Sequence, residues 1–205
     1  MVSVRSLSIL LCALACLMIP AASFADSSVD FSNSGGTLAG SSGGLTLSGS
    51  TLVAIIQGGS PKVTGDLGTV TFSTGALTGS LTMGGTFAAG GSFTVTGNGT
   101  NGVPNGTLFS GSFSGPVTWS LLTLSNGTHS YTLTGTLTGT ADGASVAGVT
   151  VQLTVNTGKG FFNGSTMISG GDTTIVGSVP EPSTVAMLGT GLLGLAGMLR
   201  RKLHS

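Results

Sequence analysis

Apolar and polar residues alternate with a period of two along most of the middle of the chain. In the clearest run, residues 149–155, every odd position is apolar and every even position is polar. Because successive side chains of a strand point to opposite faces, this alternation predicts a strand with one buried face. Shorter runs alternate in the same way at 70–72, 92–96, 117–121 and 131–134. Their threonines and branched aliphatic residues favour a pleated surface.

Turn-forming pairs separate these runs. Asn-Gly and Asp-Gly supply the positive backbone angles that tight hairpin turns need, and they occur at 98–99, 101–102, 105–106, 126–127, 142–143 and 163–164. Between residues 26 and 178 no apolar stripe has helical spacing, and glycine recurs too often for a helix interior. We therefore predict an all-β domain, an antiparallel β-sandwich or barrel of roughly ten strands. A β-solenoid is the alternative, because Thr-Gly pairs recur, although without the fixed repeat length of true solenoids.

The balance of apolar and charged residues predicts a folded domain rather than a disordered one. Apolar residues make up 40% of the chain and charged residues 6%, the reverse of the composition of disordered segments. Glycine is unusually frequent, at 37 of 205 residues against a usual ~7%. The apolar content is nevertheless high enough to predict a folded core. Residues 26–178 are the length of one domain. Their two lysines against five aspartates give a formal charge of −3, so no basic patch is present for nucleic acid.

The first 25 residues have the layout of a secretory signal peptide. One basic residue precedes the apolar stretch 7–19, and small residues follow up to Ala25. We predict cleavage by signal peptidase between Ala25 and Asp26. The apolar stretch is shorter than the roughly 20 residues that a spanning helix needs. The chain's two cysteines both lie in this segment, so the mature chain has no thiol for a disulfide or a metal site.

A different composition begins after the predicted β-domain. Val179, Pro180, Glu181 and Pro182 are followed by an apolar stretch at 184–199 and then by a basic stop signal, Arg200, Arg201 and Lys202. The prolines prevent strand pairing and favour an extended, accessible peptide. We predict that residues 184–199 form a transmembrane helix, which at 16 residues spans ~24 Å of a ~30 Å hydrocarbon core. The positive-inside rule then keeps the basic residues in the cytoplasm and the β-domain outside.

These last residues, 179–205, resemble the PEP-CTERM sorting tag, which has the same motif, short span and basic cluster in the same order. The resemblance implies that an exosortase, an integral-membrane protease, recognises Pro180, Glu181 and Pro182 and removes the tail. It also implies an inner-membrane intermediate and delivery to the cell surface or an exopolysaccharide matrix. The tag is sometimes labelled an ice-binding protein C-terminal domain, but that label concerns sorting. The alternative is an ordinary membrane anchor behind a proline hinge.

The predicted β-domain offers few groups for catalysis. It has one histidine, His129, at a predicted hairpin turn, where an exposed side chain without a catalytic role is expected. Its carboxylates are five aspartates without a paired motif, which argues against glycoside hydrolysis. The acidic patterns of known calcium loops are absent from the sequence. We therefore predict no enzyme activity, no cofactor and no metal site.

One run indicates a candidate ligand face. Five threonines alternate along a single predicted strand, at Thr132, Thr134, Thr136, Thr138 and Thr140, so all five point to the same side. Their methyl and hydroxyl groups suit ordered water or sugar. A plain solvent face is favoured, because threonine is a good strand former and one strand makes a line, whereas ice binding needs a sheet of such lines.

The sequence as a whole predicts a noncatalytic structural or adhesive protein of the cell surface or extracellular matrix, in a biofilm or exopolysaccharide setting. Its partners would be the exosortase and signal peptidase during processing, the membrane transiently, and extracellular polysaccharide. A carbohydrate- or ice-binding β-domain is the alternative, and a hydrolase is the third possibility.

Overall fold

A computed structural model of the chain describes residues 28–57 and 59–176. The predicted signal peptide, the sorting motif, the apolar stretch 184–199 and the basic stop signal lie outside these residues. Within them the chain forms thirteen strands, which confirms the predicted all-β class. The strands are β1 (Ser28–Ser34), β2 (Thr37–Ser41), β3 (Gly44–Gln57), β4 (Ser60–Ser73), β5 (Leu77–Ser80), β6 (Gly84–Phe87), β7 (Gly90–Asn98), β8 (Asn105–Phe113), β9 (Val117–Thr123), β10 (His129–Ala141), β11 (Ala144–Gly158), β12 (Ser165–Met167) and β13 (Gly170–Val176).

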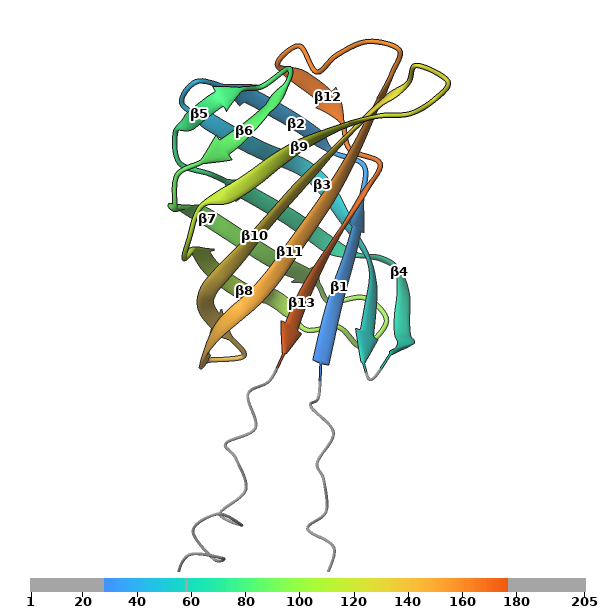
Figure 1. The fold of residues 1–205 in the computed structure, drawn as a ribbon. Helices are drawn as coiled ribbons and strands as arrows, with labels where there is room; N and C mark the ends of the chain where they lie inside the picture. The colour runs from blue at the N-terminus through green and yellow to red at the C-terminus, as the bar shows by residue number, and fades with distance from the viewer. Residues whose placement is uncertain (1–27, 58, 177–205) are drawn as a thin grey trace, which may run out of the picture. The chain divides into compact units, whose positions relative to one another are not determined.

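Eight of these strands pair in a closed ring. The order around the ring is β11, β13, β1, β3, β4, β7, β8 and β10, and β10 pairs back with β11 (Figure 1). All these pairings are antiparallel. Of the two predicted architectures the barrel is therefore the one adopted, with more strands than expected. The solenoid alternative is wrong, because the chain closes on itself by antiparallel pairing instead of stacking successive repeats.

β10 changes partner along its length, and further strands extend the sheet at one end of the barrel. Residues His129 to Thr134 pair with β9, and residues Leu137 to Ala141 pair with β8. Beyond β9 the sheet continues through β6 to β5, while β2 and β12 extend from the other side through β3. Among the described residues no helix is long and apolar enough to cross a membrane.

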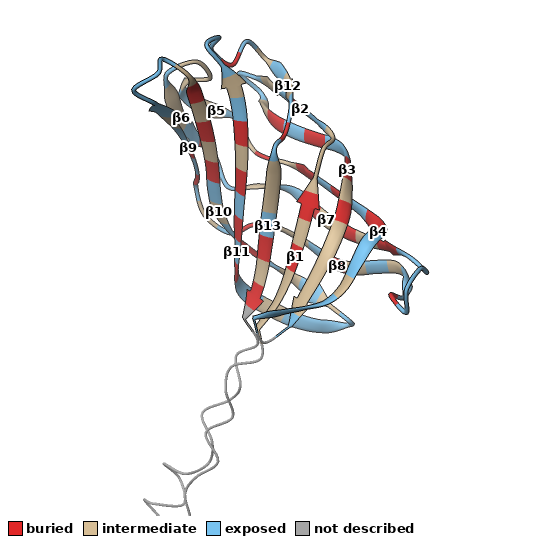
Figure 2. Ribbon diagram, turned by 90° about the vertical axis from the view of Figure 1, so that its right-hand side faces the viewer, coloured by how far each residue is buried: buried red, intermediate tan, exposed pale blue. Residues whose placement is uncertain are grey.

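Both ends of the described chain lie at one end of the barrel, away from β5, β6 and β12 (Figure 1). Ser28 and Val176 are register partners on β1 and β13, and both strands end together in Figures 1 and 2. We call the end far from this pair the distal end. It carries the β5–β6 turn, the β9–β10 loop and the β11–β12 loop (Figure 1).

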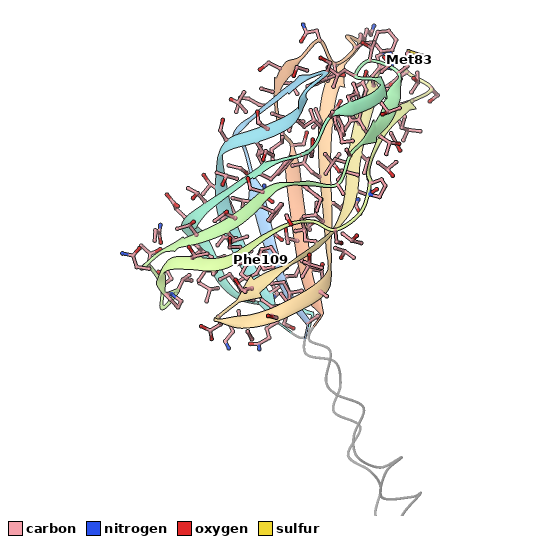
Figure 3. The ribbon with its side chains drawn as sticks, turned by 90° about the vertical axis from the view of Figure 1, so that its left-hand side faces the viewer. Met83 and Phe109 are labelled. Carbon is pink, nitrogen blue, oxygen red and sulfur yellow. The ribbon has the colours of Figure 1, made fainter. Side chains whose placement is uncertain are left out.

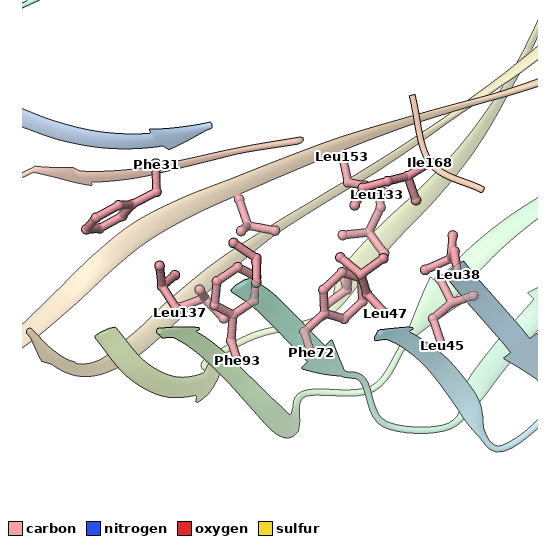
Figure 4. Packing of buried hydrophobic residues seen from close by; sticks show 14 of the residues in the cluster. Phe31, Leu38, Leu45, Leu47, Phe72, Phe93, Leu133, Leu137, Leu153 and Ile168 are labelled. Carbon is pink, nitrogen blue, oxygen red and sulfur yellow. The ribbon is translucent and has the colours of Figure 1, made fainter. Parts of the chain in front are cut away.

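The two-residue alternation places one face of each strand in the core. On β11, Val149, Val151, Leu153 and Val155 are buried, and the residues between them are exposed or half-buried (Figure 2). The other strands of the ring contribute in the same way, so apolar side chains from opposite walls meet inside the barrel (Figure 4). An eight-stranded barrel has an interior just wide enough for side chains to fill.

Aromatic rings occupy two parts of this core. Between β4, β7 and β8, Phe93 stacks on Phe72, with ring centroids 5.9 Å apart, and meets the edges of Phe109 and Phe113. In the distal part Trp119 stacks on Tyr131 at 5.0 Å. Such pairs stabilise by about 0.5–1.5 kcal/mol beyond the burial of their area.

Hydrogen bonds from the distal rings hold the loops of that end. The indole Nε1 of Trp119 donates to the carbonyl oxygen of Leu81 at 2.8 Å. The Tyr131 hydroxyl donates to the carbonyl oxygen of Thr82 at 2.7 Å and accepts from the backbone N–H of Phe162 at 3.1 Å. One buried phenol therefore ties both the β5–β6 turn and the β11–β12 loop to β10.

Glycine allows close approach of strands within the ring. Gly68 has φ +146°, and a Cβ there would overlap the carbonyl oxygen of Thr96; its register partner on β7 is also a glycine, Gly97. This is a physical reason for part of the high glycine content. Of the predicted turns, Asn105–Gly106 is wrong, because these residues begin β8 and pair with β7.

Candidate functional site

The threonine line lies on the outer face of β10. The side chains of this line are exposed at positions 134, 136, 138 and 140, and Thr132 is half-buried. The large side chains that alternate with them, Tyr131, Leu133 and Leu137, are buried. The five threonines are therefore brought to one side of the barrel, as the spacing predicts.

Neighbouring strands extend this line into rows. Thr134 lies opposite Thr118 of β9 and Gln152 of β11, and Gln152 lies opposite Asp172 of β13. Thr136 begins a second row that continues through Thr150 of β11 and Thr174 of β13. We call the outer surface of β10, β11 and β13 that carries these two rows the polar face. The rows were not predictable, because the order of the strands in the sheet cannot be deduced from the alternation alone.

An open hollow of about 440 Å³ lies in the polar face. It forms where β10 leaves β9 after Thr134 and joins β8 at Leu137. Close to this point the backbone N–H of Ser114 donates to the carbonyl oxygen of Thr136 at 2.9 Å. The lining residues are Pro116, Thr134, Gly135, Thr136, Thr150, Val151, Gln152, Asp172 and Thr174. Six of these nine residues carry a hydroxyl, amide or carboxylate group, which can exchange hydrogen bonds with a polar ligand.

Two aspartates lie near one another at the edge of this hollow. Asp172 accepts a hydrogen bond from the Ser32 hydroxyl at 2.6 Å, and Asp30 accepts one from the Thr174 hydroxyl at 3.2 Å. Burial, and secondly the charge of Asp172, raise the pKa of Asp30 above its ordinary value. In the part of the chain that the structure describes, no three His, Cys, Asp or Glu side chains come together as metal ligands do.

His129 does not occupy the exposed turn position that the sequence predicts. It begins β10, and only 8% of its surface is exposed. Its Nδ1 is 3.0 Å from the Thr123 hydroxyl, and its ring stacks on Phe161 with centroids 4.1 Å apart and planes 19° apart. Phe161 comes from the β11–β12 loop, far along the chain, so no local pattern indicates the contact. The side-chain partner of His129 is thus a hydroxyl, whereas the histidine of a catalytic triad is oriented by a carboxylate.

The distal end also carries most of the exposed large apolar side chains. Met83 lies in the β5–β6 turn (Figure 3), Leu122 and Leu124 lie at the end of β9 and in the loop after it, and Phe161 lies in the β11–β12 loop. Met167 is exposed on β12. The aromatic rings of β4, β7 and β8 are by contrast buried, and Phe109 of β8 is one of them (Figure 3).

Comparison with known families identifies the C-terminal tail. Residues 178–202 match the model of the PEP-CTERM protein-sorting motif. The chain therefore carries this motif, which confirms the resemblance and implies processing by an exosortase and export through the membrane toward the cell surface. The match covers the predicted motif at 179–182 and the predicted basic stop signal. Searches among curated proteins and among solved structures each found no match to the chain.

Proposed function

We propose that the chain is a noncatalytic structural or adhesive protein of the cell surface or extracellular matrix. The observation that carries this proposal is the sorting motif at 178–202 on a chain whose described part is a filled barrel. Exosortase processing at Pro180, Glu181 and Pro182 releases the β-domain, residues 26–178, from the short apolar stretch that holds it during export. The signal peptide is removed earlier, between Ala25 and Asp26.

The barrel supports a role that depends on surfaces rather than on an internal site. Its interior is packed with apolar side chains from all eight strands of the ring, as in small barrels whose core has no room for a ligand. The chemistry available on the outside is that of the polar face and of the distal end. Neither brings a nucleophile, a base and an orienting group together, which catalysis usually needs.

Sorting is tested with two variants of the full-length chain in its own cells. In the first, residues 179–205 are deleted; in the second, Pro180, Glu181 and Pro182 are all replaced by alanine and the span is kept. We expect the first to reach the medium or periplasm and the second to remain in the membrane as an unprocessed precursor. Cell fractionation and protease treatment of intact cells give the location, and the change in mass gives the processing. Ser183→Ala is the matched control and should behave as wild type.

Unchanged surface retention of the deletion variant, or normal processing of the alanine variant, would contradict the proposal. The first result would mean that the surface location of the protein does not depend on the tail. The second would mean that removal of the tail does not depend on the Pro-Glu-Pro motif.

A second candidate function is recognition of a carbohydrate or of ice by the polar face. The supporting observation is that Thr132, Thr134, Thr136, Thr138 and Thr140 share one face of β10, and that Thr134 and Thr136 begin the two rows that cross β11 and β13. The face belongs to a closed ring and is therefore curved, which suits a flexible sugar chain better than a flat crystal plane.

The test of this second candidate is a glycan array and an ice-recrystallisation assay on the exported chain and on Thr134→Val and Thr136→Val. Valine keeps the shape of threonine and removes the hydroxyl. Negative results for the wild-type chain in both assays, or equal activity of the valine variants, would exclude the polar face as a ligand site.

A further inference from the structure

Exposed apolar side chains gather at the distal end without an explanation in the barrel core. Met83, Leu124 and Phe161 come from three different connections at this end. Large apolar side chains that stay exposed at one end of a protein are candidates for an interaction site. The distal end is also the end farthest from Val176, after which the chain continues toward its sorting motif. A contact made there lies at the other end of the barrel from the strand that leads to this motif.

Phe161 is held in place on this end by two separate contacts. The next residue, Phe162, is 1% exposed, packs against Trp119 at 5.4 Å, and donates its backbone N–H to the Tyr131 hydroxyl. The Phe161 ring itself lies nearly parallel to the His129 ring, and 46% of its surface remains exposed. Its backbone is thus fixed from the core side, and one face of its ring is covered. Little conformational entropy remains to be lost when the other face is covered by a ligand.

The surroundings of Phe161 are polar and nearly uncharged. Asn163, in the same loop, is exposed, and the β9–β10 loop contributes Ser125 and Thr128 to the same end. In the three connections of the distal end, all of which the structure describes, Lys159 is the one charged residue. One lysine without a cluster of like charges offers little charge complementarity to a polyanion and none to a polycation, which favours a neutral partner.

We propose that Phe161 is the stacking platform of a binding site for a neutral polysaccharide. A pyranose ring presents an apolar face of C–H bonds and a rim of hydroxyl groups, which matches a flat aromatic ring with hydrogen-bonding side chains around it. A protein partner matches less well, because a stable protein interface buries about 800 Å² per partner and the apolar side chains here come from separate turns. This inference rests on the proposed function for its setting outside the cell and deepens it by naming the class of partner.

The test is binding of the chain, as the cells export and process it, to insoluble polysaccharides. Cellulose, mannan and starch serve as neutral polymers, and a calcium alginate gel serves as the acidic one. We expect binding to at least one neutral polymer, and this binding should be insensitive to 0.5 M salt in the buffer, a level at which exposed charges are largely screened.

Phe161→Ala should weaken this binding about tenfold, equivalent to ~1.4 kcal/mol. Phe161→Trp, which keeps a platform, should bind as wild type. Met83→Ala is the matched control for loss of an exposed apolar side chain at the same end, and it should not change the affinity. The thermal midpoint of each variant checks that the barrel is intact.

Several outcomes would overturn the inference. These are equal binding of Phe161→Ala and wild type, binding to alginate alone that salt abolishes, and concentration-dependent dimers in sedimentation that Phe161→Ala removes. Failure to bind any polymer while protease treatment shows the chain at the cell surface would also refute this inference and leave the proposed function intact. Absence from the surface would refute the proposed function independently of any binding result.

Discussion

Replacement of Tyr131 by phenylalanine tests how the distal loops are fixed to the barrel. The change removes one hydroxyl and leaves the aromatic stack with Trp119 unaltered. It deprives two groups of a partner, the buried N–H of Phe162 and the half-buried carbonyl of Thr82. A buried polar group without a partner costs about 1–3 kcal/mol, and the carbonyl regains part of this from water. We therefore expect a loss of about 2–3 kcal/mol in the free energy of unfolding. For a domain of this size that loss lowers the melting temperature by roughly 4–12 °C.

Urea denaturation of the exported chain measures this loss. The slope of the free energy against urea concentration should not change, because the surface exposed on unfolding is the same. Thr134→Val is the matched control, since it removes an exposed hydroxyl from the same strand and should stay within about 0.5 kcal/mol of wild type. Hydrogen exchange of the Phe162 amide should also become faster. If Tyr131→Phe were as stable as Thr134→Val and kept the slow Phe162 amide, the phenol would not be what holds these loops.

Two further substitutions test the outer face and the ring. Burial, and secondly the charge of Asp172, raise the pKa of Asp30 in the folded state. The contribution of Asp30 to the free energy of unfolding is therefore greatest below its ordinary pKa of 3.8, and it is lost as the pH rises through the raised pKa. Asp30→Asn should therefore be more stable than wild type at pH 7 and equal to it near pH 3 in urea denaturation, and equal stability at pH 7 would refute the shift. Gly68→Ala should cost at least about 3 kcal/mol, because it combines strain at φ +146° with overlap on the Thr96 carbonyl. Gly127→Ala is the control, because Gly127 has φ +76° and open space around it, and it should cost only about 1–2 kcal/mol. Thermal unfolding measures both losses. Similar losses at the two positions would show that close approach of the strands is not the reason that position 68 needs glycine.

The strands were predictable wherever alternation and turn chemistry agreed. Residues 149–155 alternate without interruption and lie within β11, and Asp142–Gly143 forms the turn between β10 and β11. The Asn105–Gly106 pair failed because a local preference for a turn was overridden by pairing of β8 with β7. Closure of the ring was not predictable, since it depends on the pairing of β1 with β13, the first and the last strand of the described chain.

The candidate site was only partly predictable for the same reason. Period-two spacing was enough to place the five threonines of β10 on one face. The rows that cross to Gln152 and Asp172, and the stack of Phe161 on His129, depend on which distant segments become neighbours. Phe161 and Phe162 are adjacent and chemically identical in the sequence, yet one is exposed and the other is buried. Nothing in their local pattern determines which of the two faces the core.

The position of β13 determines how the barrel would bear mechanical load. β13 lies between β1 and β11, and the chain leaves it at Val176 toward the sorting motif. A pull between a ligand on the distal end and an anchor beyond Val176 acts along this strand, while its ladder hydrogen bonds run across it. Such a pull loads both ladders of β13 in shear, with many bonds sharing the force at once. A tether leaving sideways from an edge strand such as β5 would instead open its bonds one after another. The arrangement therefore lets the barrel resist a pull that reaches it through its C-terminal strand.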